Sequence, residues 1–197
     1  MRGTRLATRG DVRVLAVLCF GMAAVSCGDG VSSTEVAKTA YLGLDPSIDK
    51  AITLGFQGFN AALGANIPPQ TASGDAGGTM TITGQVDQGT STNKTMRLQE
   101  ALVAYSDDST VAYATAMALP ELDMDLKNVP TGTVTGSLTG EYKMTGSLSG
   151  TVSLAITFSS QLEPGASPNQ VERMPGTTRV VGTAQAGGGS YSIDITR

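Results

Sequence analysis

Three acidic residues stand at every second position between residues 121 and 125, a spacing that could serve chemistry. Glu121, Asp123 and Asp125 alternate with apolar residues, so in an extended strand their carboxylates share one face. Ca²⁺ takes six to eight oxygen ligands, and such a row supplies part of that set. Because no EF-hand loop pattern accompanies the three acids, the sequence favours a solvated strand face, and cation binding stays open.

Two Ser-x-x-Lys sequences form a second candidate, Ser47 with Lys50 and Ser91 with Lys94. In penicillin-recognising enzymes this spacing places a nucleophilic Ser one helical turn from a Lys. The chain resembles that family in no other respect, because it contains neither a Lys-Thr-Gly nor a Ser-Asp-Asn sequence. We therefore interpret Ser47 and Lys50 as solvated residues in the first turn of a helix.

The amino-acid composition excludes several other kinds of catalytic and metal site. The chain has no His, which excludes Ser-His-Asp triads, imidazole metal ligands and His-based acid–base catalysis. Acids outnumber bases and no basic cluster occurs, which argues against nucleic-acid binding. The sequence predicts no catalytic residue, no cofactor and no metal site.

Cys27 is the residue whose context is most specific. Four Arg precede the apolar residues 14–25, and the segment ends in Ala24, Val25, Ser26 and Cys27. A basic start, a short apolar stretch and small residues before the cleavage point are typical of an export signal. Twelve apolar residues are too few for a membrane span, which needs about twenty.

This segment resembles the lipobox of bacterial lipoprotein precursors, in which the cysteine is lipidated and becomes the new N-terminus. The resemblance covers only the first thirty residues and implies a signal peptide at residues 1–26, lipid attachment at Cys27 and anchoring in the bacterial cell envelope. Gly28 after the cysteine favours the outer membrane over the inner one. Ala24 and Ser26 also fit an ordinary secretory cleavage site at the same bond, so a secreted product is the alternative.

The rest of the chain must supply one folded domain. Residues 27–44 are predicted as the lipidated N-terminus and tether, and residues 45–197 as a single β-rich domain. Without residues 1–26, which hold four Arg and one Asp, the chain keeps nine basic and sixteen acidic residues, a net charge of −7. It also keeps only one Cys, the lipid site, so no disulfide is expected.

One helix is predicted over residues 45–63. Asp45 is a favourable N-cap and Pro46 fits the first helical position. An apolar stripe follows at spacings of three and four residues and ends at Leu63: Ile48, Ile52, Phe56, Phe59 and Leu63. Gly64 can end the helix.

After residue 79 the apolar period becomes two, which predicts about eight strands. The clearest stretch is 133–158, where large apolar residues and glycines share the even positions. Residues 66–78 and 161–176 are predicted as loops, and the chain ends in a hairpin. The predicted fold is mainly β (α+β): an antiparallel curled sheet, barrel or sandwich with one N-terminal amphipathic helix.

The predicted function is a non-catalytic structural or interaction module anchored in the envelope. Its partners would be the membrane, through the N-terminal lipid, and a protein or an apolar ligand. The alternative is a carrier that holds a lipid or other apolar ligand in the curled sheet, with the helix as lid. An enzyme that uses only paired carboxylates, such as a glycosidase, is the third hypothesis, but no pair of acids is singled out by the sequence.

Overall fold

The computed structural model describes residues 32–87 and 89–197, so the predicted signal peptide and Cys27 lie outside the described residues. One long helix, α1 (Ser33–Ala61), precedes ten strands in this part of the chain. The strands pair antiparallel and belong to one connected sheet. The predicted class, mainly β with a curled antiparallel sheet and one N-terminal helix, is confirmed.

The helix begins twelve residues earlier than predicted, so the assignment of residues 33–44 to a tether is wrong. Ser32 is the N-cap, and its Oγ accepts a hydrogen bond of 3.2 Å from the backbone N–H of Glu35. Ser32 and Glu35 have the spacing of a capping box, which was the sequence signal for this start. Pro46 lies inside the helix, where it removes one backbone donor.

The helix also ends slightly earlier than predicted. Ala62 is the C-cap, and its N–H donates to the carbonyl of Phe59. Leu63 is fully exposed beyond the last turn, so its assignment to the buried stripe is wrong. That stripe instead extends toward the N-terminus through smaller residues and a tyrosine: Ala37, Ala40, Tyr41 and Leu44.

Ten strands follow α1, two more than predicted: β1 (Gln70–Ser73), β2 (Gly77–Val86), β3 (Lys94–Ser106), β4 (Val111–Thr115), β5 (Glu121–Lys127), β6 (Thr133–Gly146), β7 (Gly150–Pro164), β8 (Val171–Arg173), β9 (Arg179–Ala186) and β10 (Gly189–Thr196). The two short strands β1 and β8 lie in segments predicted as loops. Neither has the alternating apolar pattern that marks the longer strands.

The strands run mostly in chain order across the sheet, from β1 at one edge to β10 at the other. Between β3 and β6 the intervening strand is interrupted: β4 pairs with one half of β6 and β5 with the other half. Residues 116–120 connect β4 to β5, and we call this segment the 116–120 bulge. Met117 in the bulge is fully exposed.

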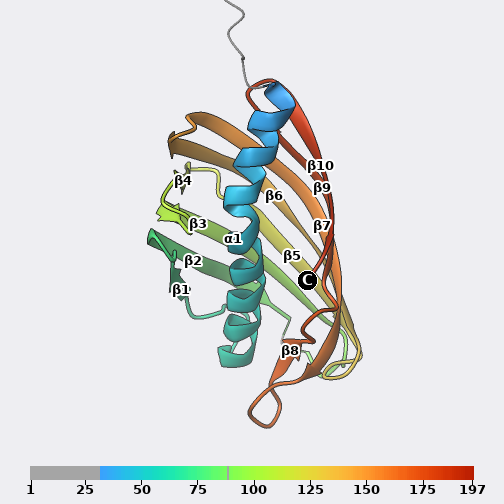
Figure 1. Cartoon of the computed structure of the whole chain (residues 1–197). Coiled ribbons are helices and arrows are strands. Elements are labelled where there is room, and N and C mark those ends of the chain that lie inside the picture. The colour runs from blue at the N-terminus through green and yellow to red at the C-terminus, as the bar shows by residue number, and fades with distance from the viewer. Residues whose placement is uncertain (1–31, 88) are drawn as a thin grey trace, which may run out of the picture. The chain divides into compact units, whose positions relative to one another are not determined.

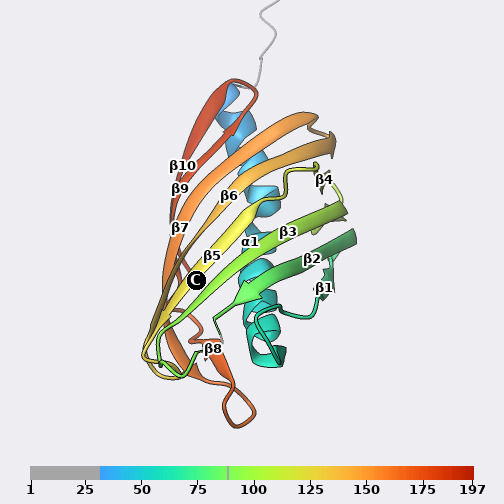
Figure 2. The same ribbon diagram turned by 180° about the vertical axis from the view of Figure 1, so that it is seen from behind.

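The concave face of the sheet is covered by α1 (Figure 1). The helix contacts β9 and β10 on one side and β1 and β2 on the other, so it lies between the two sheet edges. Seen from behind, the strands curve around it (Figure 2). The apolar faces of the helix and sheet meet in one continuous core.

Small residues let the helix approach the sheet closely. A Cβ atom on Gly55 would lie 2.5 Å from Met124 Cε and 2.9 Å from Leu98 Cδ1, closer than carbon atoms pack. The helix backbone therefore rests directly on side chains of β3 and β5. At this contact the helix leaves no room for a ligand between itself and the sheet.

Candidate functional site

The structure gives the first Ser-x-x-Lys pair a structural role rather than a catalytic one. Ser47 is buried, and its hydroxyl donates a 2.6 Å hydrogen bond to the carbonyl of Leu44. Lys50 Nζ lies 2.7 Å from Asp107 Oδ1 and 2.8 Å from Asp75 Oδ1. The prediction of a solvated first turn is wrong, because α1 starts earlier and buries Ser47 in its middle.

Lys50 is held in its charged form. Burial lowers the pKa of Lys50, but its hydrogen bonds with Asp107 and Asp75 outweigh burial and raise the pKa above its usual value. A permanently protonated ammonium cannot act as the general base for a serine nucleophile. Lys50 instead ties α1 to the β3–β4 turn and to the end of β1.

The second pair, Ser91 and Lys94, does not lie on a helix. Lys94 is the first residue of β3, and its Nζ donates to the carbonyl of Gly89. The hydroxyl of Ser91 accepts a hydrogen bond from the backbone N–H of Asn93. Both groups stabilise the turn before β3, so this sequence carries no catalytic geometry.

Glu121, Asp123 and Asp125 lie on the exposed face of β5, and the predicted solvated strand face is confirmed. In the register of the sheet, Arg97 of β3 stands directly opposite Asp123. Among the described residues, no group of three or more His, Cys, Asp or Glu residues is placed to hold a metal ion. The row of acids is therefore part of the polar outer surface.

A hollow of about 620 Å³ lies beside the C-terminal half of α1, and we call it the α1–β8 hollow. Its walls combine a guanidinium-rich side with an apolar side. They are formed by residues of α1, β8, the turn after β8 and the chain end, among them Asp49, Thr53, Phe56, Arg173, Met174, Pro175 and Arg197. Sequence reasoning missed this site, because β8 and the turn lie in a segment without periodicity.

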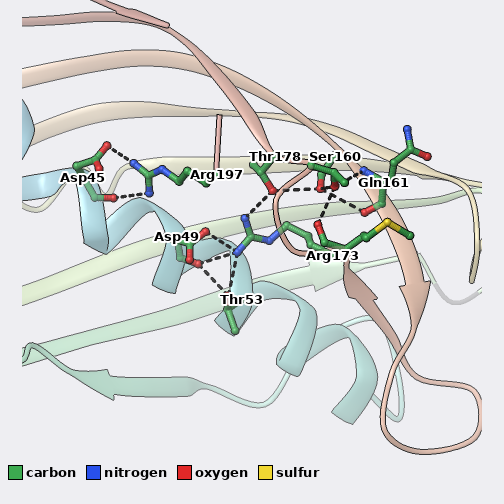
Figure 3. A network of polar contacts seen from close by, with 10 residues as sticks. Asp45, Asp49, Thr53, Ser160, Gln161, Arg173, Thr178 and Arg197 are labelled. Carbon is green, nitrogen blue, oxygen red and sulfur yellow. Dashed lines mark hydrogen bonds and ion pairs between the residues drawn. The ribbon is translucent and has the colours of Figure 1, made fainter. Parts of the chain in front are cut away.

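Arg173 organises one side of the hollow (Figure 3). Its Nη2 lies 2.7 Å from Asp49 Oδ1 and 3.1 Å from Thr53 Oγ1, both on α1. Its Nη1 donates to Thr178 Oγ1 at 3.1 Å, and Thr178 in turn bonds Ser160 of β7. Only 11 % of the Arg173 side chain is exposed, so this residue fastens β8 to the helix.

Arg197 also lines the hollow. Its guanidinium donates to the side chain and to the backbone carbonyl of Asp45 (Figure 3). The Tyr41 hydroxyl donates to the same carboxylate. Asp45 and Asp49 are one helical turn apart, so the two arginines bind successive turns of α1.

The lining of the hollow combines hydroxyl, charged and apolar side chains. Both threonine hydroxyls on its wall contact Arg173, and of its two lining acids, Asp49 and Glu172, Asp49 is paired with Arg173. Phe56 and Met174 provide apolar surface, as is usual for pockets that take small organic ligands.

The least expected polar residue is Glu100, on the inner face of β3. It is fully buried, and Tyr142 Oη donates a 2.6 Å hydrogen bond to its Oε2, while Oε1 has no partner. Burial raises the pKa of Glu100 to about 7, although the hydrogen bond from Tyr142 opposes this rise. The sequence did hold a signal: Glu100 continues the even-numbered apolar positions of Met96, Leu98 and Leu102.

No protein-family model, no curated protein and no solved structure matches this chain. Within residues 32–87 and 89–197, the structure holds no helix with the length and apolar character needed to cross a membrane.

Proposed function

We propose that the chain is a bacterial envelope lipoprotein, anchored through Cys27, whose β-rich domain is a non-catalytic interaction or structural module. The observation that carries this proposal is the placement of Cys27 after a basic start and a short apolar segment. Two or more acyl chains are needed for stable attachment, and the lipoprotein modification supplies them. The outer membrane is the favoured location because Gly28 follows the cysteine.

The described domain supports a non-catalytic role. The serine and lysine with a catalytic spacing are both engaged in contacts that hold α1 to the sheet. The acidic row on β5 is exposed, and its members form no paired arrangement with a buried partner. What the domain offers to a partner is a polar sheet surface and the α1–β8 hollow.

Lipid attachment is tested by expressing the full chain in a bacterium that processes lipoproteins, with labelled palmitate in the medium. We expect label and membrane fractionation for the wild type and for Cys19→Ser, and loss of both for Cys27→Ser. Mass spectrometry of the N-terminal peptide identifies the acylated residue. A mature chain that is cleaved before residue 27 but carries no acyl group would leave only the secreted alternative.

A second candidate is an apolar-ligand carrier, which the α1–β8 hollow favours. The sequence predicts a ligand site inside the curled sheet, but α1 packs closely against that face. The hollow beside the helix is therefore the site at which we expect the ligand. Met174 is partly exposed on its wall, whereas Met117 is fully exposed in the 116–120 bulge. We expect organic extraction of the purified domain to release an apolar molecule that Met174→Asp loses and Met117→Asp retains. A clean extract from the folded wild type would contradict this candidate.

A further inference from the structure

Glu100 lies where the sheet changes partners. On its N-terminal side, β3 pairs with β5 up to Gln99 opposite Glu121, and further along it pairs with β4 at Tyr105. Between these points the backbone N–H of Glu100 donates to the carbonyl of Pro120 at 3.0 Å. The backbone N–H of Leu102 donates to the side chain of Thr115 instead of a strand backbone. Glu100 is thus adjacent to the point at which β3 changes its partner from β5 to β4.

The 116–120 bulge is attached by few contacts. Residues 116–118 are exposed, whereas Pro120 is buried at the end of the bulge. Pro120 packs against Gly140 of β6, where an added Cβ would lie 2.5 Å from the proline ring. The segment is therefore exposed over residues 116–118 and held to β6 through Pro120.

Tyr142 spans the interruption. It belongs to β6 and stands opposite Thr115 in the register, yet its hydroxyl reaches Glu100 on β3. The hydrogen bond therefore connects the two strands on either side of the break. This side-chain hydrogen bond joins β3 and β6 where neither β4 nor β5 forms backbone hydrogen bonds to both strands.

Glu100 has no charged neighbour that would stabilise its ionised form. Opposite it on β2 stands Ile82, and its inner-face neighbours on β3 are Leu98 and Leu102. From β6 only the neutral Tyr142 faces it. The charged residues near the middle of α1 are engaged in ion pairs with other residues. Lys50 pairs with Asp107 and Asp75, and Asp45 and Asp49 each pair with an arginine.

We propose that Glu100 is a proton-operated latch: protonated, it stays buried beside Tyr142 and the break stays closed, whereas loss of the proton opens the 116–120 bulge, because the cost of the buried charge exceeds the strengthening of the hydrogen bond from Tyr142. An ionised carboxylate with one hydrogen bond and a bare oxygen is costly in an apolar interior. Local opening gives it water at a lower cost than unfolding the domain. The latch works independently of lipid on Cys27 and of any ligand in the α1–β8 hollow.

Hydrogen exchange measured by mass spectrometry tests the latch at about pH 5.5 and about pH 8.5. After correction for the intrinsic pH dependence of exchange, we expect protection in peptides covering residues 98–106 and 111–126 to fall about tenfold at the higher pH. Peptides from α1 and β7 should keep their protection. Glu100→Gln should retain protection in all of these peptides at both pH values.

Glu141→Gln is the matched control, because Glu141 is adjacent to Tyr142 but exposed on the outer face, where it accepts a hydrogen bond from Ser153. It should behave as the wild type. Equal pH dependence in the wild type and in Glu100→Gln would overturn the proposal. If Glu100→Gln does not fold, infrared spectroscopy of the wild type decides: the carbonyl stretch of a protonated carboxyl group must be present near pH 6, and its absence refutes the latch.

Discussion

The hydroxyl of Tyr113 lies at the position that a side chain on Gly43 would occupy. This hydroxyl also donates a 2.9 Å hydrogen bond to the carbonyl of Ala40, one turn earlier in α1. A strand of the sheet therefore binds the helix backbone directly, through a contact that needs a glycine on the helix. The contact between Gly43 on α1 and Tyr113 on β4 fixes the position of the helix along its own axis relative to this strand.

Gly43→Ala should overpack a filled core, which costs about 2 kcal/mol in the free energy of unfolding. The loss should exceed the roughly 1 kcal/mol that alanine contributes through helix propensity. Adding Tyr113→Phe removes the clashing oxygen and should recover part of the loss. Gly64→Ala is the control, because no atom lies within 4 Å of its Cβ position. Urea unfolding measures all four proteins, and an unchanged Gly43→Ala would disprove the contact.

The two carboxylates that bind Lys50 should differ in importance. The side chain of Asp107 is 7 % exposed and that of Asp75 is 73 % exposed. Lys50→Met leaves the buried carboxylate of Asp107 with Tyr105 as its main side-chain donor, and we expect a loss of about 2 kcal/mol. Asp75→Asn should cost at most about 0.5 kcal/mol, as exposed ion pairs do.

The contribution of Asp107 should also depend on pH. Burial raises its pKa, but hydrogen bonds from Lys50, the Asp75 backbone and Tyr105 outweigh burial and hold the pKa below its usual value. A carboxyl group with a lowered pKa in the folded state stabilises the protein at neutral pH. That stability is lost as the pH falls below the usual pKa of an aspartate and then through the lowered pKa of Asp107. In Lys50→Met the acid-induced loss should be smaller, and identical acid unfolding curves would contradict this account.

Arg173 should hold β8 in place. Arg173→Met removes the guanidinium donors to Asp49, Thr53 and Thr178, and we expect a loss of about 2 kcal/mol with increased hydrogen exchange around β8. The exposed pair of Arg179 and Asp194 is the control. Arg179→Met should leave both measurements unchanged within error. Wild-type protection of β8 in Arg173→Met would show that Asn60, which bonds both backbone groups of Val171, is a sufficient anchor.

The fold class followed from the sequence because strand alternation was strong where strands are long. The even positions of residues 133–158 are the clearest case, and β6 and β7 pair there with their apolar residues in register. The sequence predicts too short a helix because Pro46 fits a first helical position, although a capping box is also present at Ser32. A proline inside a helix is tolerated when tertiary packing, here against both sheet edges, supports the surrounding turns.

The candidate site was much less predictable than the fold. The α1–β8 hollow depends on Arg173 and Arg197, which meet their partners on α1 across 124 and 152 residues of sequence. Charges in loops carry no periodic signal, so their pairing appears only once the sheet has formed. Glu100 differs, because an acid at an apolar position of an alternating strand could have been recognised from the sequence.

Glu100 should make the domain less stable as the pH rises. In the folded state its pKa is raised to about 7 from 4.5, with burial as the main cause. Below the ordinary value both states bind the proton, so the group has no effect. At a pH between the ordinary pKa and the raised pKa, Glu100 keeps its proton only in the folded state. The free energy of unfolding therefore falls as the pH rises through this range. Above the raised value the full cost, about 3 kcal/mol, is present.

Glu100→Gln should remove this component while keeping an acceptor for Tyr142. We expect its advantage over the wild type to be small near pH 4, to grow up to about pH 7 and to be constant above that. Urea unfolding at a series of pH values measures the difference, with Glu141→Gln as the exposed control. A constant difference between Glu100→Gln and the wild type across this range would mean that Glu100 keeps the same charge in both states, and would refute the buried neutral acid.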